Sequence, residues 1–202
     1  MVSVSNGVVR IESFSLNIPS FSLQDKCVHV IGSNGSGKST FLRVVAGILD
    51  LTVGKRILPT DLKVGYVPQN YRSSLMPWLS ARDNVQLISK SDECIKNLLK
   101  LGFKKSDLDK RPHQLSGGQC QRVAIVRDAI DEHDLLILDE PFSGLDIYTI
   151  PLVGKLLKEK MDKGMKIILT SHTSLPKSMT SNLATVQVVR ISDNTAEVRD
   201  ET

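Results

Sequence analysis

Residues Gly32–Thr40 read GSNGSGKST and directly follow a short apolar run, CVHVI, at Cys27–Ile31. The run is rich in β-branched residues, which predicts a buried strand. After the loop, apolar residues recur at helical spacing and form one stripe: Phe41, Leu42, Val45, Ile48 and Leu49. A loop of pattern GxxxxGK[ST] that joins a strand to a helix is a phosphate-binding loop. This stretch therefore predicts an α/β fold that binds a nucleotide.

The chemistry of the loop follows from its residue types. Its glycines allow the backbone to curl so that several N–H groups point at one centre, and the following helix adds its positive N-terminal end. Lys38 can reach the β- and γ-phosphates, and the hydroxyl of Ser39 can bind Mg²⁺. We expect the whole loop to contact the nucleotide: Gly32, Ser33, Asn34, Gly35, Ser36, Gly37, Lys38, Ser39 and Thr40.

A second apolar run, Leu135–Glu140 (LLILDE), ends in two carboxylates. Four consecutive apolar residues predict a central parallel strand, and open α/β sheets bind ligands at the carboxyl ends of such strands. Asp139 is predicted to hold Mg²⁺, directly or through water. Glu140 is predicted to take a proton from the attacking water, or at least to orient it.

The segment Leu115, Ser116, Gly117, Gly118 and Gln119 (LSGGQ) has the pattern of a helix start. Ser116 can cap a helix that begins near Gly117, and Gln119 stands three residues further on, as in a capping box. A helix start with bare glycines is an anion site. Since one chain has one phosphate loop, a second phosphate-binding surface suggests a site shared with a partner molecule.

Alternating strands and helices predict a mostly parallel sheet that is covered on both faces. Strands are expected at Val64–Val67, Lys166–Thr170, Val186–Val189 and Ala196–Arg199, besides short alternating strands over Val8–Leu23 that Pro19 interrupts. Helices are expected at Asp92–Leu101, Gly118–Ile130 and Leu152–Met161, the last beginning near Thr149 and ending at Gly164. The middle third lacks strand patterns. This predicts one domain with a core lobe, about 1–72 and 131–202, and a helical lobe, about 73–130.

Composition narrows the class of protein. The 202 residues are 41% hydrophobic and 24% charged, with a net charge of +4 that is spread along the chain. No apolar stretch approaches the ~20 residues of a membrane-spanning helix, and the N-terminus lacks the pattern of an export signal. The cysteines form no metal-binding pattern, and no basic block with aromatics suggests nucleic acid. We therefore expect a cytoplasmic protein whose membrane partner, if any, is a separate chain.

Six motifs in a fixed order carry a family resemblance. They are GSNGSGKST at 32–40, YVPQ at 66–69, LSGGQ at 115–119, LLILDE at 135–140, SGLD at 143–146 and the LTSH that ends at His172. The chain resembles the nucleotide-binding domain of ATP-binding-cassette (ABC) proteins over essentially its whole length. The resemblance implies a phosphate-loop NTPase core with a mostly parallel sheet, a small antiparallel β portion at the N-terminus and an inserted α-helical lobe.

The resemblance also implies how ATP and Mg²⁺ are used. Two protomers, identical or close paralogues, would pack head to tail, with each ATP between the Lys38 loop of one and Ser116–Gly118 of the other. Gln69 would sense Mg²⁺ and the attacking water, and link the site to the helical lobe. His172 would contact the γ-phosphate. Because all six motifs are intact, hydrolysis is expected and not merely binding.

Two further roles are implied by the resemblance. Asp146 would cross the dimer interface and organise the opposite site. An aromatic side chain upstream of the loop would stack on adenine, with Phe14 as the first candidate and Phe21 as the alternative.

The leading functional hypothesis is the ATPase subunit of a transporter, peripheral at the cytoplasmic face through an integral membrane partner. Met76–Ser80 (MPWLS) and Asp83–Val85 (DNV) resemble importers of small anions, whereas GYVPQ is also common in importers of metals and other nutrients. Trp78 is either an exposed interface residue or part of the core of the helical lobe. The alternative is a soluble cassette ATPase in cofactor assembly or repair. A kinase or GTPase is disfavoured by LSGGQ and by the lack of a guanine-reading NKxD motif.

Overall fold

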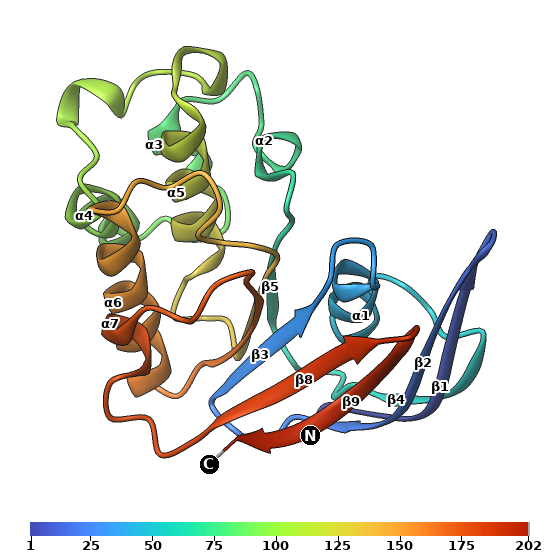
Figure 1. The fold of residues 1–202 in the computed structure, drawn as a ribbon. Helices are drawn as coiled ribbons and strands as arrows, with labels where there is room; N and C mark the ends of the chain where they lie inside the picture. The colour runs from blue at the N-terminus through green and yellow to red at the C-terminus, as the bar shows by residue number, and fades with distance from the viewer. Residues whose placement is uncertain (202) are drawn as a thin grey trace.

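The computed structural model describes the backbone of residues 1–201 and the side chains of residues 1–198. The described residues form one nine-stranded sheet of order β4-β1-β2-β9-β8-β3-β7-β6-β5 (Figure 1). The strands are β1 Ser3–Ile11, β2 Phe14–Ser22, β3 Cys27–Gly32, β4 Val53–Ile57, β5 Val64–Val67, β6 Leu135–Leu138, β7 Lys166–Thr170, β8 Val186–Ser192 and β9 Thr195–Glu201. The helices are α1 Lys38–Val45, α2 Tyr71–Ser74, α3 Ala81–Val85, α4 Asp92–Lys100, α5 Gly117–Asp128, α6 Thr149–Asp162 and α7 Lys177–Thr180, with 3₁₀ turns at Lys105–Asp107 and Pro112–Gln114.

The strands that position the site are parallel. β8, β3, β7, β6 and β5 pair in parallel, and all four residues of β6 are buried. Alternate residues of β6 face opposite layers: Leu135 and Ile137 pack with α1, and Leu136 and Leu138 pack with α5 and α6. Burial on both faces explains the continuous apolar run, because neither face of the strand meets water.

The antiparallel portion at the N-terminus is confirmed, with one correction. β1 pairs antiparallel with β2 and β4, as β8 does with β9. Pro19 does not interrupt β2, since the pairs Ser5↔Ser20 and Gly7↔Ile18 flank it. Opposite this gap in the pairing, Asn6 has φ 48° and departs from strand geometry. The proline is tolerated because an irregular neighbour does not need its missing N–H.

After the phosphate loop, one prediction was wrong and one strand was not predicted. The helix ends at Val45 and not beyond Leu49, because Gly47 adopts φ 77° and turns the chain. Ile48 is consequently 59% exposed and lies outside the helical stripe. β4 was not predicted, because it is an edge strand of which four of the five residues are exposed and it therefore shows no alternation.

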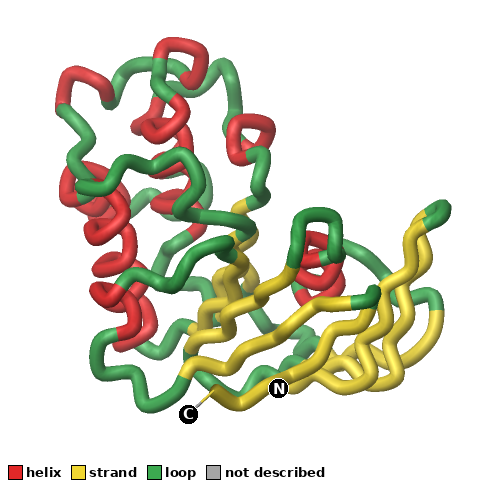
Figure 2. The backbone as a smooth tube through the Cα atoms, viewed as in Figure 1, coloured by secondary structure: helices red, strands yellow, loops and turns green. Residues whose placement is uncertain are grey.

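The segment between β5 and β6 contributes helices and no strand of the sheet. α2, α3, α4 and α5 gather at one end of the sheet, where α6 also packs (Figure 2). α6 begins at Thr149, as its proline position predicts, and Gly164 at φ 106° follows its end. The helical insert is therefore present. The boundaries of the two lobes stay a prediction.

Candidate functional site

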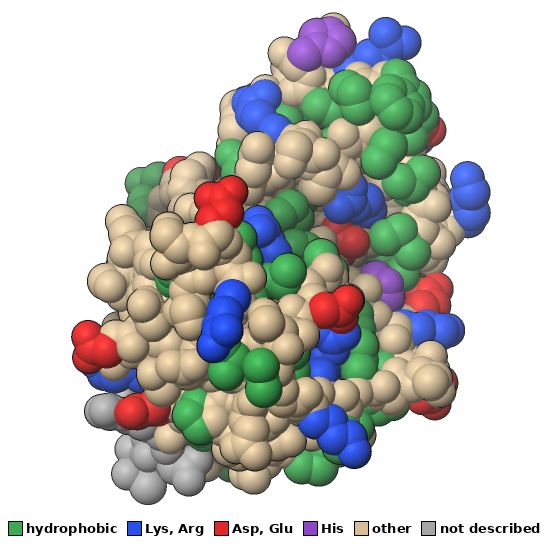
Figure 3. Space-filling model, turned by 90° about the vertical axis from the view of Figure 1, so that its right-hand side faces the viewer, with side chains coloured by type: hydrophobic (Ala, Val, Ile, Leu, Met, Phe, Trp, Pro, Cys, Tyr) green, Lys and Arg blue, Asp and Glu red, His purple; other side chains and the backbone are tan. Residues whose placement is uncertain are grey.

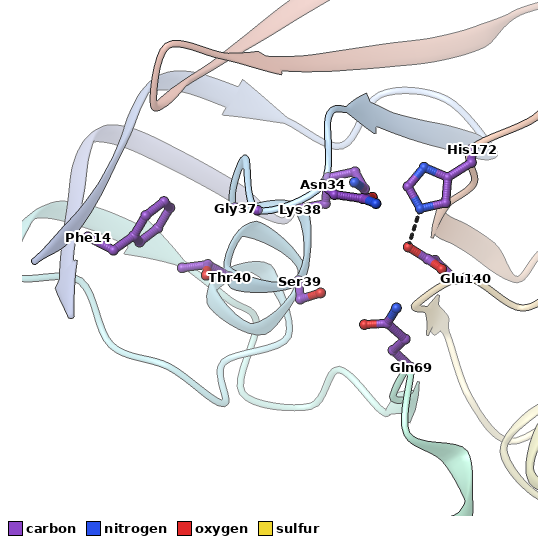
Figure 4. Close-up of a pocket in the computed structure, with 10 residues that line it drawn as sticks. Phe14, Asn34, Gly37, Lys38, Ser39, Thr40, Gln69, Glu140 and His172 are labelled. Atoms are coloured by element: carbon purple, nitrogen blue, oxygen red, sulfur yellow. Dashed lines mark ion pairs between the residues drawn. The ribbon is translucent and has the colours of Figure 1, made fainter. Parts of the chain in front are cut away.

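A cavity of about 510 Å³ opens between the loop that follows β3 and the ends of β5, β6 and β7. Figure 4 shows Gln69 and Glu140 facing the phosphate loop across it, with Phe14 at the far end. The residues that line it come from segments far apart in the sequence: Phe14, Asn34, Gly35, Gly37, Lys38, Ser39, Thr40, Gln69, Glu140 and His172. Every one of them was a candidate from the sequence.

The phosphate loop has the conformation that its glycines allow. Gly35 and Gly37 adopt φ 76° and φ 108°, values that L side chains rarely adopt. At Gly32, a Cβ atom would lie 2.6 Å from the carbonyl oxygen of Ile191. The Nζ of Lys38 donates to the carbonyls of Gly32 and Ser33, 3.0 Å from each. The buried ammonium thus holds the loop closed around the space for a phosphate.

Thr170 links the two carboxylate residues that follow β6. Its hydroxyl donates to Oδ1 of Asp139 over 2.8 Å and accepts the N–H of Glu140 over 2.7 Å. Glu140 adopts φ 54°, a strained conformation for a residue with a side chain. Thr170 was missed in the sequence analysis, although its position as the last residue of a strand in LTSH was the available signal.

Glu140 and His172 form an ion-pair contact across the cavity (Figure 4). The Nε2 atom of His172 lies 2.7 Å from Oε1 of Glu140. The carboxylate side chain is largely covered, whereas the imidazole is 44% exposed. Glu140, the candidate general base, therefore contacts a side chain that is itself partly open to solvent.

The oxygen atoms around the loop fit magnesium. Ser39 supplies a hydroxyl and Gln69 an amide oxygen at the cavity, and Asp139 is a buried carboxylate whose Oδ1 is bonded to Thr170. Magnesium prefers oxygen donors and usually keeps waters and phosphate oxygens as its other ligands. The residues present are thus suited to a Mg–nucleotide complex.

The two adenine candidates have different environments. Phe14 is half-buried on the cavity wall, and a Cβ on Gly37 would lie 2.8 Å from its ring. Phe21 is buried in the core, with its ring centroid 5.1 Å from that of Phe41 in an edge-on arrangement. The alternative Phe21 is therefore wrong, because its ring cannot reach a ligand. Phe14 remains the prediction.

We expect Phe14→Ala to raise the Kd for ATP about tenfold, since stacking of a base on an aromatic ring contributes roughly 1–3 kcal/mol. Phe14→Tyr keeps the ring and should bind ATP as the unmodified chain does. Isothermal titration calorimetry measures both variants. An unchanged Kd for Phe14→Ala would show that the ring only packs against the loop.

The LSGGQ segment lies apart from this cavity. Of the described residues that line the cavity, none belongs to 115–119. The predicted capping box is confirmed: the N–H of Gln119 donates to Oγ of Ser116 over 3.2 Å, and the N–H of Ser116 donates to Oε1 of Gln119 over 2.9 Å. Leu115 is buried, and Gly117 and Gly118 are partly exposed. The phosphate loop and the LSGGQ helix start therefore lie at separate places on one chain, and a phosphate-binding role for the helix start stays a prediction.

Asp146 caps the start of α6. Its Oδ1 accepts the N–H groups of Tyr148 and Thr149 at 3.0 and 2.8 Å, and its Oδ2 accepts the hydroxyl of Thr149. The hydrogen bond from Thr149 is the largest of the effects that lower the pKa of Asp146 below its usual value. The side chain is exposed, so its predicted place at a dimer interface stays a prediction.

Comparison with known proteins agrees with this geometry. The sequence profile described as "ABC transporter" matches residues 16–143. An ABC transporter ATP-binding protein of Haemophilus influenzae is 36% identical over 177 residues, covering 83% of this chain and 71% of the relative. A zinc import ATP-binding protein of Wolbachia pipientis is 29% identical over 197 residues, covering 87% and 79%. An aliphatic sulfonates import ATP-binding protein of Bacillus anthracis is 38% identical over 137 residues, covering 60% and 52%.

A solved structure shares the fold. It is a dimeric ATP-binding cassette in a post-hydrolysis state with ADP and phosphate, which superposes with a TM-score of 0.80 at 24% identity over 100% of this chain and 98% of that one. The loop, the carboxylates and the matching profile agree with one another. The chain is an ABC ATPase and belongs to the family of ABC transporter ATP-binding domains.

Proposed function

We propose that this chain is the ATP-hydrolysing subunit of a small-solute importer, which dimerises around Mg–ATP and drives a separate membrane-spanning partner. The observation that supports dimerisation is that the phosphate loop and the LSGGQ helix start lie at different places on the chain. The cavity gathers the phosphate loop, Gln69, Glu140 and His172, while the LSGGQ helix start lies elsewhere on the same chain. A second protomer, packed head to tail, supplies what each cavity lacks.

The residues of the cavity have distinct proposed tasks. Bound Mg–ATP supplies the scissile γ-phosphate and the charge of the metal. The loop N–H groups and Lys38 would bind the phosphates, and Ser39, Gln69 and Asp139 would hold the metal. Glu140 accepts the proton of the attacking water through Oε2, while its Oε1 stays in contact with His172. The imidazole of His172 contacts the γ-phosphate by a hydrogen bond.

The partner protomer completes this arrangement. Its Ser116, Gly117 and Gly118 present the N-terminal end of α5, where backbone N–H groups point outward and favour an anion. The SGLD loop that carries its Asp146 packs on that helix start, because a Cβ on Gly118 would be 3.3 Å from the carbonyl oxygen of Gly144. ATP thereby joins the two protomers, and hydrolysis releases them.

The helical end of the molecule offers the surface for the membrane partner. Hydrophobic side chains gather on this upper part in Figure 3. Trp78 is 65% exposed, and Leu87 and Ile88 are exposed nearby in sequence. The alternative that Trp78 belongs to the core is therefore wrong. An exposed tryptophan is an anchor typical of protein interfaces. Among the described residues, no helix has the length and apolar character needed to cross a bilayer.

The importer assignment rests on two of the relatives reported above, which are named import ATP-binding proteins for zinc and for aliphatic sulfonates. We expect the tagged chain, expressed in its own host and extracted with mild detergent, to recover one integral membrane protein. Trp78→Glu should weaken binding of the partner about thirtyfold and reduce its recovery accordingly, since a hot-spot tryptophan contributes roughly 2 kcal/mol or more. The matched control is Ile48→Glu, which places the same charge at a similarly exposed apolar residue beside α1.

ATP binding measured on both variants separates loss of the partner from misfolding. Recovery of a complex without any integral membrane protein would overturn the transporter role and favour an assembly or repair ATPase. Equal loss for Trp78→Glu and Ile48→Glu would remove Trp78 from the interface.

A further inference from the structure

A buried glutamine connects the LSGGQ helix to the backbone of Glu140. Gln121 lies on α5, two residues beyond the LSGGQ segment, and is 1% exposed. Its Nε2 donates to the carbonyl of Pro141 over 2.9 Å and to that of Glu140 over 3.3 Å. These two carbonyls fix the orientation of the amide, because its oxygen cannot face them.

The backbone that Gln121 holds is the strained one. Glu140 adopts φ 54°, and its N–H is bonded to Thr170 on β7. On the opposite side its carbonyl accepts from Gln121 and from the hydroxyl of Ser143, the latter over 3.0 Å. Ser143 belongs to the same loop as Glu140, whereas Gln121 belongs to a helix of the insert. Gln121 thus hydrogen-bonds the backbone of Glu140 from a helix of the insert.

The other end of the amide reaches the SGLD loop. Oε1 of Gln121 is buried without a hydrogen-bond partner among the described residues, and it would lie 3.7 Å from a Cβ on Gly144. Gly118, at the start of the same helix, approaches the carbonyl of Gly144 as well. One face of α5 therefore packs on the loop that runs from Glu140 to Gly144, so a displacement of the helix is transmitted to Glu140.

We propose that Gln121 is a positioning residue: its amide holds the Glu140 peptide in the orientation for proton transfer and couples that peptide to α5, whose LSGGQ end is seated on the partner's nucleotide in the shared site. The inference rests on the proposed function, because it requires the shared site. It makes each protomer's hydrolysis depend on its own helix having engaged the opposite ATP. ATP hydrolysis at one site then depends on whether the other shared site has formed.

The test is Gln121→Met, which keeps the side-chain length and removes the amide. The chain offers a matched control in Gln187→Met. Gln187 is 3% exposed, its Nε2 donates to the carbonyl of Ser22 over 3.0 Å, and its Oε1 likewise lacks a partner among the described side chains. Both substitutions remove one buried amide, and only Gln121 contacts the Glu140 turn.

We expect Gln121→Met to lower kcat about tenfold or more with the KM for ATP changed less than about twofold, the pattern of a group that acts in the transition state. Gln187→Met should retain kcat at a similar melting temperature. Equal kcat for the two variants would overturn the proposal. If Gln121→Met does not fold, Gln121→Asn replaces it: it keeps an amide but is one methylene shorter, so it no longer reaches the two carbonyls, and the same loss of kcat is expected.

A second measurement separates this inference from the proposed function. In the Glu140→Gln background, Gln121→Met should leave the ATP-dependent dimer intact on light scattering. Loss of that dimer would make Gln121 an assembly residue and overturn the positioning role. If Glu140→Gln alone fails to dimerise with ATP, the shared-site function itself fails.

Discussion

Glu140→Gln is expected to abolish ATP turnover and to trap a dimer that persists in Mg–ATP. The amide has the size of the carboxylate, and its oxygen can still face Nε2 of His172 at the observed 2.7 Å. It cannot accept a proton from water, and loss of a general base lowers rates by roughly 10²–10⁴-fold. Binding is retained because Glu140 makes no contact that the phosphates need. Nucleotide therefore enters the shared site and is not consumed.

Size-exclusion chromatography with light scattering measures the mass with and without Mg–ATP, at a protein concentration high enough to offset the missing membrane partner. Glu159→Gln is a charge-matched control on α6, at a partly exposed side chain that does not line the cavity, and it should hydrolyse ATP and show no trapped dimer. A Glu140→Gln protein that stays monomeric at saturating Mg–ATP would contradict the head-to-tail site.

The strands and helices that could be predicted from the sequence are those whose local hydrophobic pattern matches their burial in the fold. β5 and β7 have the predicted bounds, Val64–Val67 and Lys166–Thr170. In β7 the reason is burial on both faces, which makes its central residues Ile167–Leu169 continuously apolar. In β5 the buried and partly buried residues alternate, and Pro68 marks its end. The edge strand β4 has no such pattern, since nearly all its side chains meet water. The end of α1 was misplaced because one glycine conformation at Gly47 outweighs an apolar spacing that continues for another turn.

The site shows the same division. The phosphate loop, Asp139 and Glu140 were predictable because each belongs to a motif of consecutive residues. The capping box of Ser116 is equally local, since its two partners are three residues apart. Thr170 and Gln121 were not, because each acts on Glu140 through a contact between distant segments. The choice between Phe14 and Phe21 also required the fold, since both are aromatic residues of β2 and only burial distinguishes them.

Lys38→Ala is expected to raise the Kd for ATP about a hundredfold, because a hydrogen bond to a charged group contributes roughly 1.5–3 kcal/mol and two phosphates share this ammonium. The Nζ of Lys38 donates to the backbone carbonyls of Gly32 and Ser33 and so already lies at the loop. A phosphate therefore only has to replace these two acceptors. Lys166→Ala is the matched control: its Nζ also binds two backbone carbonyls, those of Leu23 and Gln24 at 3.2 Å. Calorimetry should show that Lys166→Ala binds ATP normally while both variants lose similar stability in urea. Comparable loss of ATP affinity in the two variants would mean that Lys38 stabilises the loop and does not itself bind phosphate.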